Sequence, residues 1–148
     1  AKGWLSSSLR STLNTIDILA EEGLIFTTDL LNDDQPYLIK TRSGKPMVSV
    51  SYTSEVNDFS FLRQGLSVDT GLQMFKEQFD WLYSESETSG RFMNIGLHPH
   101  VIGQPFRIRA IRDFIRYAKQ FDDVWFATRE EIAEWYLQTH QDHIEPPA

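Results

Sequence analysis

Hydrophobic positions along the chain follow two patterns, one typical of helices and one of short buried strands. Apolar residues spaced three and four apart predict three helices, over residues 8–22, 69–84 and 105–121. Short apolar runs between turn-forming residues predict four strands, over residues 24–28, 47–51, 91–97 and 124–127. Strands that alternate with helices imply right-handed crossovers, so the pattern predicts an α/β fold with a parallel sheet.

Four parallel strands are too few to close a barrel. An open parallel sheet of this length would leave apolar strands exposed at both edges. We therefore expect further sequence or another chain to complete the sheet, and residues 1–148 to form one folding unit or part of one. Thr128 and Glu131 predict a capping box before the last apolar helical run, and residues 142–148 are expected to fray.

Composition narrows the function classes. A net charge of −7, spread along the chain, argues against a nucleic-acid partner. The absence of cysteine excludes a disulfide framework, a thiolate zinc site and a cysteine nucleophile. No run of about 18 apolar residues is present and residues 1–4 lack the apolar core of a signal peptide, so we expect no membrane partner and a cytoplasmic location.

Polar residues with catalytic chemistry follow each predicted strand. Because ligands of parallel α/β folds bind outside the carboxyl ends of the strands, we expect these residues to gather at one rim. A rim of carboxylates and imidazoles can perform acid–base chemistry on an amide, since histidine has its ordinary pKa nearest neutrality. The candidates, in strand order, are Asp29, Asp33 and Asp34; Glu55, Asn57 and Asp58; His98 and His100; and Thr128.

Each candidate also has a structural interpretation. Asp33 and Asp34 precede Gln35-Pro36 and are typical of a solvated turn. Asn57 and Asp58 are typical of the N-cap of a short helix over residues 59–66, and His98 is open to interpretation as a structural histidine. In an extended segment His98 and His100 point to opposite sides, which disfavours a shared metal ion.

Several ordered blocks of the sequence resemble the C-terminal half of the polysaccharide deacetylase (NodB-homology) family. The resemblance runs from about Gly3 to Tyr136 and is closest to the branch with allantoinase-type and peptidoglycan-deacetylase-type members. The blocks are Gly3-Trp4-Leu5-Ser6, Asn32-Asp33-Asp34-Gln35-Pro36-Tyr37, Glu55-Val56-Asn57-Asp58, Leu97-His98-Pro99-His100 with Gly103-Gln104-Pro105, and Val124-Trp125-Phe126-Ala127-Thr128 with Glu131-Ile132 and Trp135-Tyr136.

The resemblance implies the C-terminal half of a distorted (β/α) barrel, with residues 1–148 as part of a single catalytic domain. It implies hydrolysis of a non-peptide C–N bond, with His98 as general acid to the leaving nitrogen. We expect Trp4, Asp33, Asp34, Asn57, Asp58 and His100 to shape the substrate pocket. The family's base and its zinc or other divalent metal belong to the N-terminal half, so we expect no metal bound by this chain alone.

The resemblance leaves the substrate open. The first expectation is a cyclic ureide or another amide, since residues 6–10 lack the proline that sugar deacetylases carry there. The alternatives are a metal-dependent N-deacetylase of an amino sugar or peptidoglycan, and a non-catalytic carbohydrate-binding barrel. The expected partners are the small-molecule substrate, the N-terminal half of the domain, and further copies in a homo-oligomer. The chain alone is expected to be inactive.

Overall fold

The computed structural model describes residues 1–143 and divides the chain into two compact units. One unit, here called the sheet unit, comprises residues 1–52 and the segment that begins at Phe126; the other, the helical unit, spans Thr53–Trp125. Of the tail predicted to fray, residues 144–148 lie outside the described residues. The prediction of a single domain over residues 1–148 stays a prediction.

The sheet unit is built on four short strands in the order β1-β2-β4-β3. β1 (Gly3–Trp4), β2 (Phe26–Thr27) and β4 (Met47–Ser49) are parallel, with Phe26 in register with both Gly3 and Val48. β3 (Tyr37–Ile39) pairs antiparallel with β4. The α/β class with a parallel sheet is therefore confirmed, and one antiparallel strand is added at the edge.

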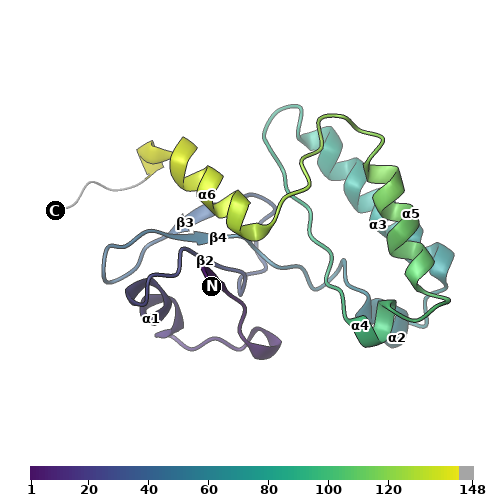
Figure 1. The fold of residues 1–148 in the computed structure, drawn as a ribbon, viewed down its shortest axis with the longest axis horizontal. Helices are drawn as coiled ribbons and strands as arrows, with labels where there is room; N and C mark the ends of the chain where they lie inside the picture. The colour runs from purple at the N-terminus through teal and green to yellow at the C-terminus, as the bar shows by residue number, and fades with distance from the viewer. Residues whose placement is uncertain (144–148) are drawn as a thin grey trace. The chain divides into compact units, whose positions relative to one another are not determined.

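Helices α1 (Thr15–Glu21) and α6 (Arg129–Thr139) lie on opposite sides of this sheet (Figure 1). Leu19 and Ala20 of α1 pack against Met47. Leu38 of β3 and Val48 of β4 are paired. Because successive side chains of a strand alternate, Val48 points to the face of the sheet opposite to that of Met47. The predicted capping box of α6 is present, because Thr128 and Glu131 exchange side-chain-to-backbone hydrogen bonds.

The first helix begins later than its apolar spacing predicts. Residues 7–9 form a 3-10 turn, with Ser8 and Leu9 at φ values of 55° and 58°, in the left-handed region. The side chain of Thr15 accepts a hydrogen bond from the backbone N–H of Thr12 at 2.8 Å. Hydroxyl side chains compete with helical hydrogen bonds in this way, which shortens the helix predicted over residues 8–22 at its start.

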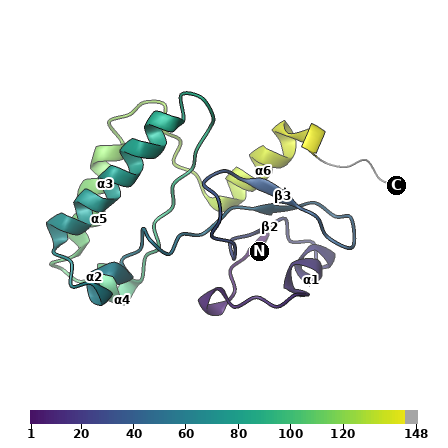
Figure 2. The same cartoon turned by 180° about the vertical axis from the view of Figure 1, so that it is seen from behind.

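The helical unit packs α3 (Val68–Glu85) against α5 (Ile108–Ala118), with α2 (Phe59–Arg63) and α4 (Pro99–Ile102) at one end (Figures 1 and 2). Its core is aromatic: the Phe75 ring is fully buried and contacts the rings of Phe61 and Phe114. The predicted helices over residues 69–84 and 105–121 are thus confirmed with small changes at their ends. A final 3-10 turn, η2, spans Gln141–His143 in the sheet unit.

Two predicted strands are wrong for the part of the chain that the structure describes. Residues 91–97 form no strand and contribute one parallel bridge, between Gly96 and Asn57, and residues 124–127 form none. A strand exists only through hydrogen bonds to a neighbour, and an apolar run does not specify that neighbour. Trp4 lies in β1, because Lys2 and Trp4 accept backbone hydrogen bonds from the segment of β2.

Candidate active site

The single bridge in the helical unit positions the candidate catalytic residues. The N–H of Gly96 donates to the carbonyl of Val56 at 3.0 Å, and the N–H of Asp58 donates to the carbonyl of Gly96 at 2.9 Å. Two segments forty residues apart in sequence therefore run parallel, and both turn into helices directly after the bridge. The residues that follow the bridge on each side, Asp58 and His98, come together.

Asp58 holds His98 through two hydrogen bonds. Its Oδ2 accepts from the backbone N–H of His98 at 2.6 Å, and its Oδ1 lies 2.7 Å from Nδ1 of the imidazole. The Asp58 side chain is fully buried, whereas the His98 side chain is 35% exposed. A buried carboxylate thus anchors a histidine that is still open to solvent.

This geometry fixes which nitrogen of His98 is available for chemistry. With Nδ1 engaged by Asp58, Nε2 has no hydrogen-bond partner among residues 1–143. His98 is the N-cap of α4, and Pro99 occupies the first helical position. A backbone N–H at this position has no acceptor within the helix, so proline loses no hydrogen bond there. The carboxylate on Nδ1 selects the tautomer and orientation of the ring, as in carboxylate–histidine pairs of hydrolases.

His100 lies near His98, contrary to the expectation that the two point to opposite sides. Their ring centroids are 5.8 Å apart, and both rings pack edge-on near the ring of Phe59. The expectation is wrong because the chain changes from an extended to a helical conformation at Pro99. His100 is exposed and contributes a second imidazole to the same surface.

Asn57 has the structural role that the sequence predicts, whereas Asp58 contacts the candidate histidine. The predicted short helix exists as α2, and Oδ1 of Asn57 accepts a hydrogen bond from the N–H of Phe59 at 2.9 Å, as expected of a helix-start residue. Asp58 makes no side-chain cap and uses both carboxylate oxygens on His98. Both residues are buried, so neither is a solvated surface polar group.

Two acidic candidates of the sheet unit, Asp29 and Asp33, have structural roles. Asp33 is exposed and accepts a hydrogen bond from the N–H of Gln35 at 3.0 Å, which is the turn interpretation. Asp29 is buried and accepts from both the N–H and the hydroxyl of Ser6, each at 2.6 Å. It therefore holds the segment after β1 in place. Asp34 is half-buried in the same loop as Asp33.

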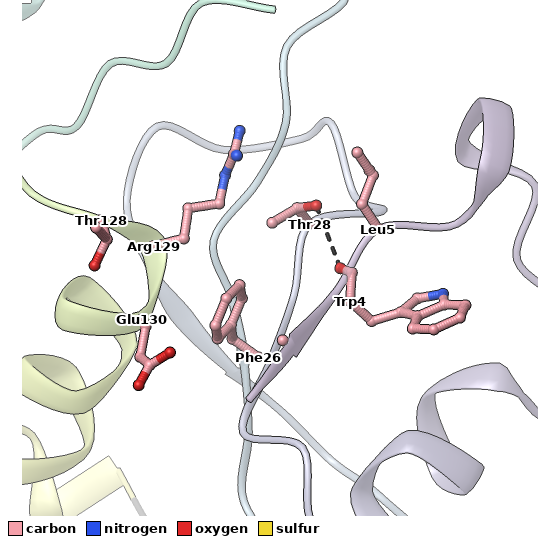
Figure 3. A pocket seen from close by; sticks show the side chains of 8 residues that line it. Trp4, Leu5, Phe26, Thr28, Thr128, Arg129 and Glu130 are labelled. Carbon is pink, nitrogen blue, oxygen red and sulfur yellow. Dashed lines mark hydrogen bonds between the residues drawn. The ribbon is translucent and has the colours of Figure 1, made fainter. Parts of the chain in front are cut away.

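Trp4 borders a shallow hollow of the sheet unit. The hollow, about 340 Å³ in volume, lies between β1, β2 and the start of α6 (Figure 3). In Figure 3 the Trp4 indole and the Arg129 guanidinium point in different directions, so the polar groups do not converge. Burial lowers the pKa of Arg129 from its ordinary value. The lining residues are Gly3, Trp4, Leu5, Phe26, Thr28, Thr128, Arg129 and Glu130.

The described residues do not fit a metal centre. Among residues 1–143, no group of three or more His, Cys, Asp or Glu side chains has an arrangement that could hold a metal ion. Nor is any described helix both long and apolar enough to cross a bilayer. The chemistry that this part of the chain offers is that of the Asp58–His98 pair.

The sequence did not single out Phe59. Its ring centroid lies 4.6 Å from that of His98, closer than any other aromatic ring to this histidine. The available signal was its position next to Asp58, which places an aromatic side chain at the first turn of the same helix.

The chain is similar to known proteins over most of its length. No protein-family model matches it. A Schizosaccharomyces pombe protein described as "Putative polysaccharide deacetylase" is 32% identical over a 126-residue alignment, and the match covers 78% of this chain and 39% of that protein.

Two solved structures are similar over 94% of the chain. One is described as a "probable Polysaccharide deacetylase" from Pseudomonas aeruginosa PAO1, with 37% identity and a TM-score of 0.86. The other is Puue Allantoinase, with 36% identity and a TM-score of 0.87. The chain spans 47% of each, about half the length of the solved relatives that it matches.

Proposed function

We propose, from the polysaccharide deacetylase (NodB-like) fold to which these relatives assign the chain, that it is the C-terminal half of a hydrolase of non-peptide C–N bonds. His98 is its general acid, and Asp58 positions His98. The observation that carries the proposal is the buried Asp58 carboxylate, which engages both the backbone N–H and Nδ1 of a half-exposed histidine.

Cleavage of an amide needs a proton for the leaving nitrogen. When the tetrahedral intermediate collapses, the C–N bond breaks and the electron pair goes to nitrogen, which leaves as an amine once it is protonated. With Nδ1 directed to Asp58, Nε2 of His98 is the atom that delivers this proton. The base that activates water belongs, in this proposal, to the N-terminal half.

We propose a cyclic ureide as the first substrate class, because the chain is as similar to an allantoinase as to a polysaccharide deacetylase. The similarity to polysaccharide deacetylases keeps N-acetylated amino sugars as the second class. Both substrates place a leaving nitrogen next to a carbonyl carbon, so the role of His98 is the same in both. Asn57 and His100, both in the helical unit, are proposed to contact substrate. The expected substrate contacts of Trp4, Asp33 and Asp34 stay predictions.

The test compares His98→Gln, Asp58→Asn and the wild type, in the protein as it is naturally made, on allantoin and on an N-acetylated chitin oligosaccharide. Removal of a general acid is expected to lower kcat by roughly 10²- to 10⁴-fold. Asp58→Asn, which disturbs the tautomer of His98, is expected to lower kcat by at least about tenfold. His140→Gln is the control, because this histidine stacks on the ring of Tyr136 and has no assigned role in the reaction; it is expected to keep wild-type activity.

An activated anilide substrate makes this test specific for the acid role. An aniline with electron-withdrawing groups leaves without full protonation, so the deficit of His98→Gln is expected to shrink on it. A deficit of equal size on both kinds of substrate would show that His98 does something other than protonate the leaving group. A wild type without activity on either substrate would favour the non-catalytic alternative.

A further inference from the structure

The hydrogen bonds to Asp58 do not fully determine how the His98 imidazole is oriented. They fix the backbone N–H and one ring nitrogen, at 2.6 and 2.7 Å. Hydrogen bonds weaken steeply only when the angle at hydrogen falls below about 120°. The ring can therefore tilt about its Nδ1 contact, and such a tilt moves Nε2, the atom on the opposite side of the ring.

Phe59 opposes that tilt. Its ring meets the His98 ring edge to face, with centroids 4.6 Å apart and an angle of 74° between the planes. This arrangement is favoured by the quadrupoles of the two rings. The phenyl ring of Phe59 thus defines the plane of the His98 imidazole, while the Asp58 carboxylate defines the position of its Nδ1.

Phe59 is itself held from two sides. Oδ1 of Asn57 accepts a hydrogen bond from its backbone N–H at 2.9 Å. The guanidinium carbon of Arg63, one turn further along α2, lies 5.7 Å from the centre of its ring, within the range of a cation–π contact. The consecutive residues Asn57, Asp58 and Phe59 therefore all act on the placement of one imidazole.

We infer that Phe59 is a positioning residue that sets the ring plane of His98 and so aims Nε2. The inference rests on the proposed role of His98 as general acid and adds a residue to which nothing else assigns a function. Proton transfer depends on distance and alignment, so a small misplacement of Nε2 lowers the rate of bond cleavage more than the binding of substrate. The His100 ring also packs near Phe59, and His100 is exposed to solvent.

The experiment removes the aromatic ring and reads out His98 directly. Phe59→Leu and Phe59→Met are made in the protein as it is naturally expressed, with the His98 imidazole signals followed by NMR and kinetics measured on the substrate that the wild type hydrolyses. Loss of the ring is expected to move the His98 signals and to lower kcat about 3- to 10-fold with KM unchanged. Phe59→Tyr keeps the ring and is expected to restore both.

Phe61→Leu is the matched control. Phe61 lies two positions further along α2, but it is buried against Phe75 and has no ring contact with His98. This variant is expected to lower the unfolding midpoint while the His98 signals and kcat stay at wild-type values. The comparison of the Phe59 and Phe61 variants therefore distinguishes a positioning role of Phe59 from a general loss of stability.

Unchanged His98 signals and kcat in both ring-less variants, beside a strong deficit in His98→Gln, would overturn the positioning role and leave the general acid in place. A His98→Gln variant with full activity would overturn the proposed function instead, even where Phe59→Leu moves the imidazole signals. Equal changes in Phe59→Leu and Phe61→Leu would reduce Phe59 to a packing residue and overturn the inference.

Discussion

At the scale of single residues, burial decides which polar groups of this chain have a specific task. Asp58 is fully buried and directs both oxygens at His98, whereas Asp33 is exposed and completes a turn. Burying a carboxylate costs several kcal/mol of stability unless hydrogen bonds compensate it. The two hydrogen bonds from His98 supply this compensation at Asp58. Both aspartates follow predicted strands and were candidates for the same reason. Residue type alone does not reveal which of them is buried.

Glu131 gives a prediction about acid stability. Hydrogen bonds from the backbone N–H and hydroxyl of Thr128 hold the pKa of its carboxyl below the ordinary value. A lowered folded-state pKa contributes stability above the unfolded value of about 4.3, which is lost as pH falls through the folded pKa. Glu131→Gln is therefore expected to lower the unfolding midpoint at pH 7 and to weaken its decline below about pH 4.3.

The measurement is thermal unfolding followed by circular dichroism between pH 7 and pH 3. Glu22→Gln, at the exposed end of α1, removes the same charge outside the capping box and is the control. A Glu131→Gln midpoint that runs parallel to the wild type over the whole pH range would contradict the prediction.

At the scale of elements, periodic helices were predictable and strands only in part. The α3 and α5 helices follow from apolar spacing, because one face of each is buried in the same aromatic core. The strand predicted over residues 91–97 reduces to one bridge at Gly96, since pairing depends on a partner elsewhere in the chain. Even so, the rule that polar residues follow strands made both Asp58 and His98 candidates, and the structure brings these two residues into contact.

Gly71 gives a prediction about packing between α2 and α3. A Cβ at this position would lie 2.1 Å from Cζ of Phe61, inside the core of the helical unit. Gly→Ala in a helix interior gains about 1 kcal/mol of helix propensity, but overpacking a core costs about 1–3 kcal/mol. We expect the clash to win, so that Gly71→Ala lowers the free energy of unfolding by about 1 kcal/mol.

Chemical denaturation of Gly71→Ala measures this change. Gly90→Ala is the control, because a Cβ there meets no atom within 4 Å and the backbone does not need a positive φ. The control is expected to change stability by less than about 0.5 kcal/mol. A Gly71→Ala variant at least as stable as the wild type would show that the Phe61 ring moves aside freely.

At the scale of the whole molecule, the proposed function divides the reaction between two halves, with the acid, His98, in this chain and the base in the N-terminal half. Among the described residues, Asp58 and His98 form a carboxylate–histidine pair with a buried carboxylate, and no cluster is fit to hold a metal ion. The solved relatives are about twice as long as the part that this chain matches. The α/β fold class was predictable from local patterns, which also made His98 a candidate. Its pairing with Asp58 became visible only in the contact between segments forty residues apart.

This division of the reaction between two halves determines what the isolated chain can do. Residues 1–148 produced alone are expected to lack C–N hydrolase activity, because the proposed base and the activator of water belong to the other half of the fold. The protein as naturally made is expected to hydrolyse the ureide or the acetylated sugar, with a dependence on His98. Circular dichroism and NMR of residues 1–148 first establish that the isolated chain folds. Activity of the folded isolated chain equal to that of the natural protein would mean that Asp58, His98 and their neighbours supply both acid and base, and would place the whole reaction within this half.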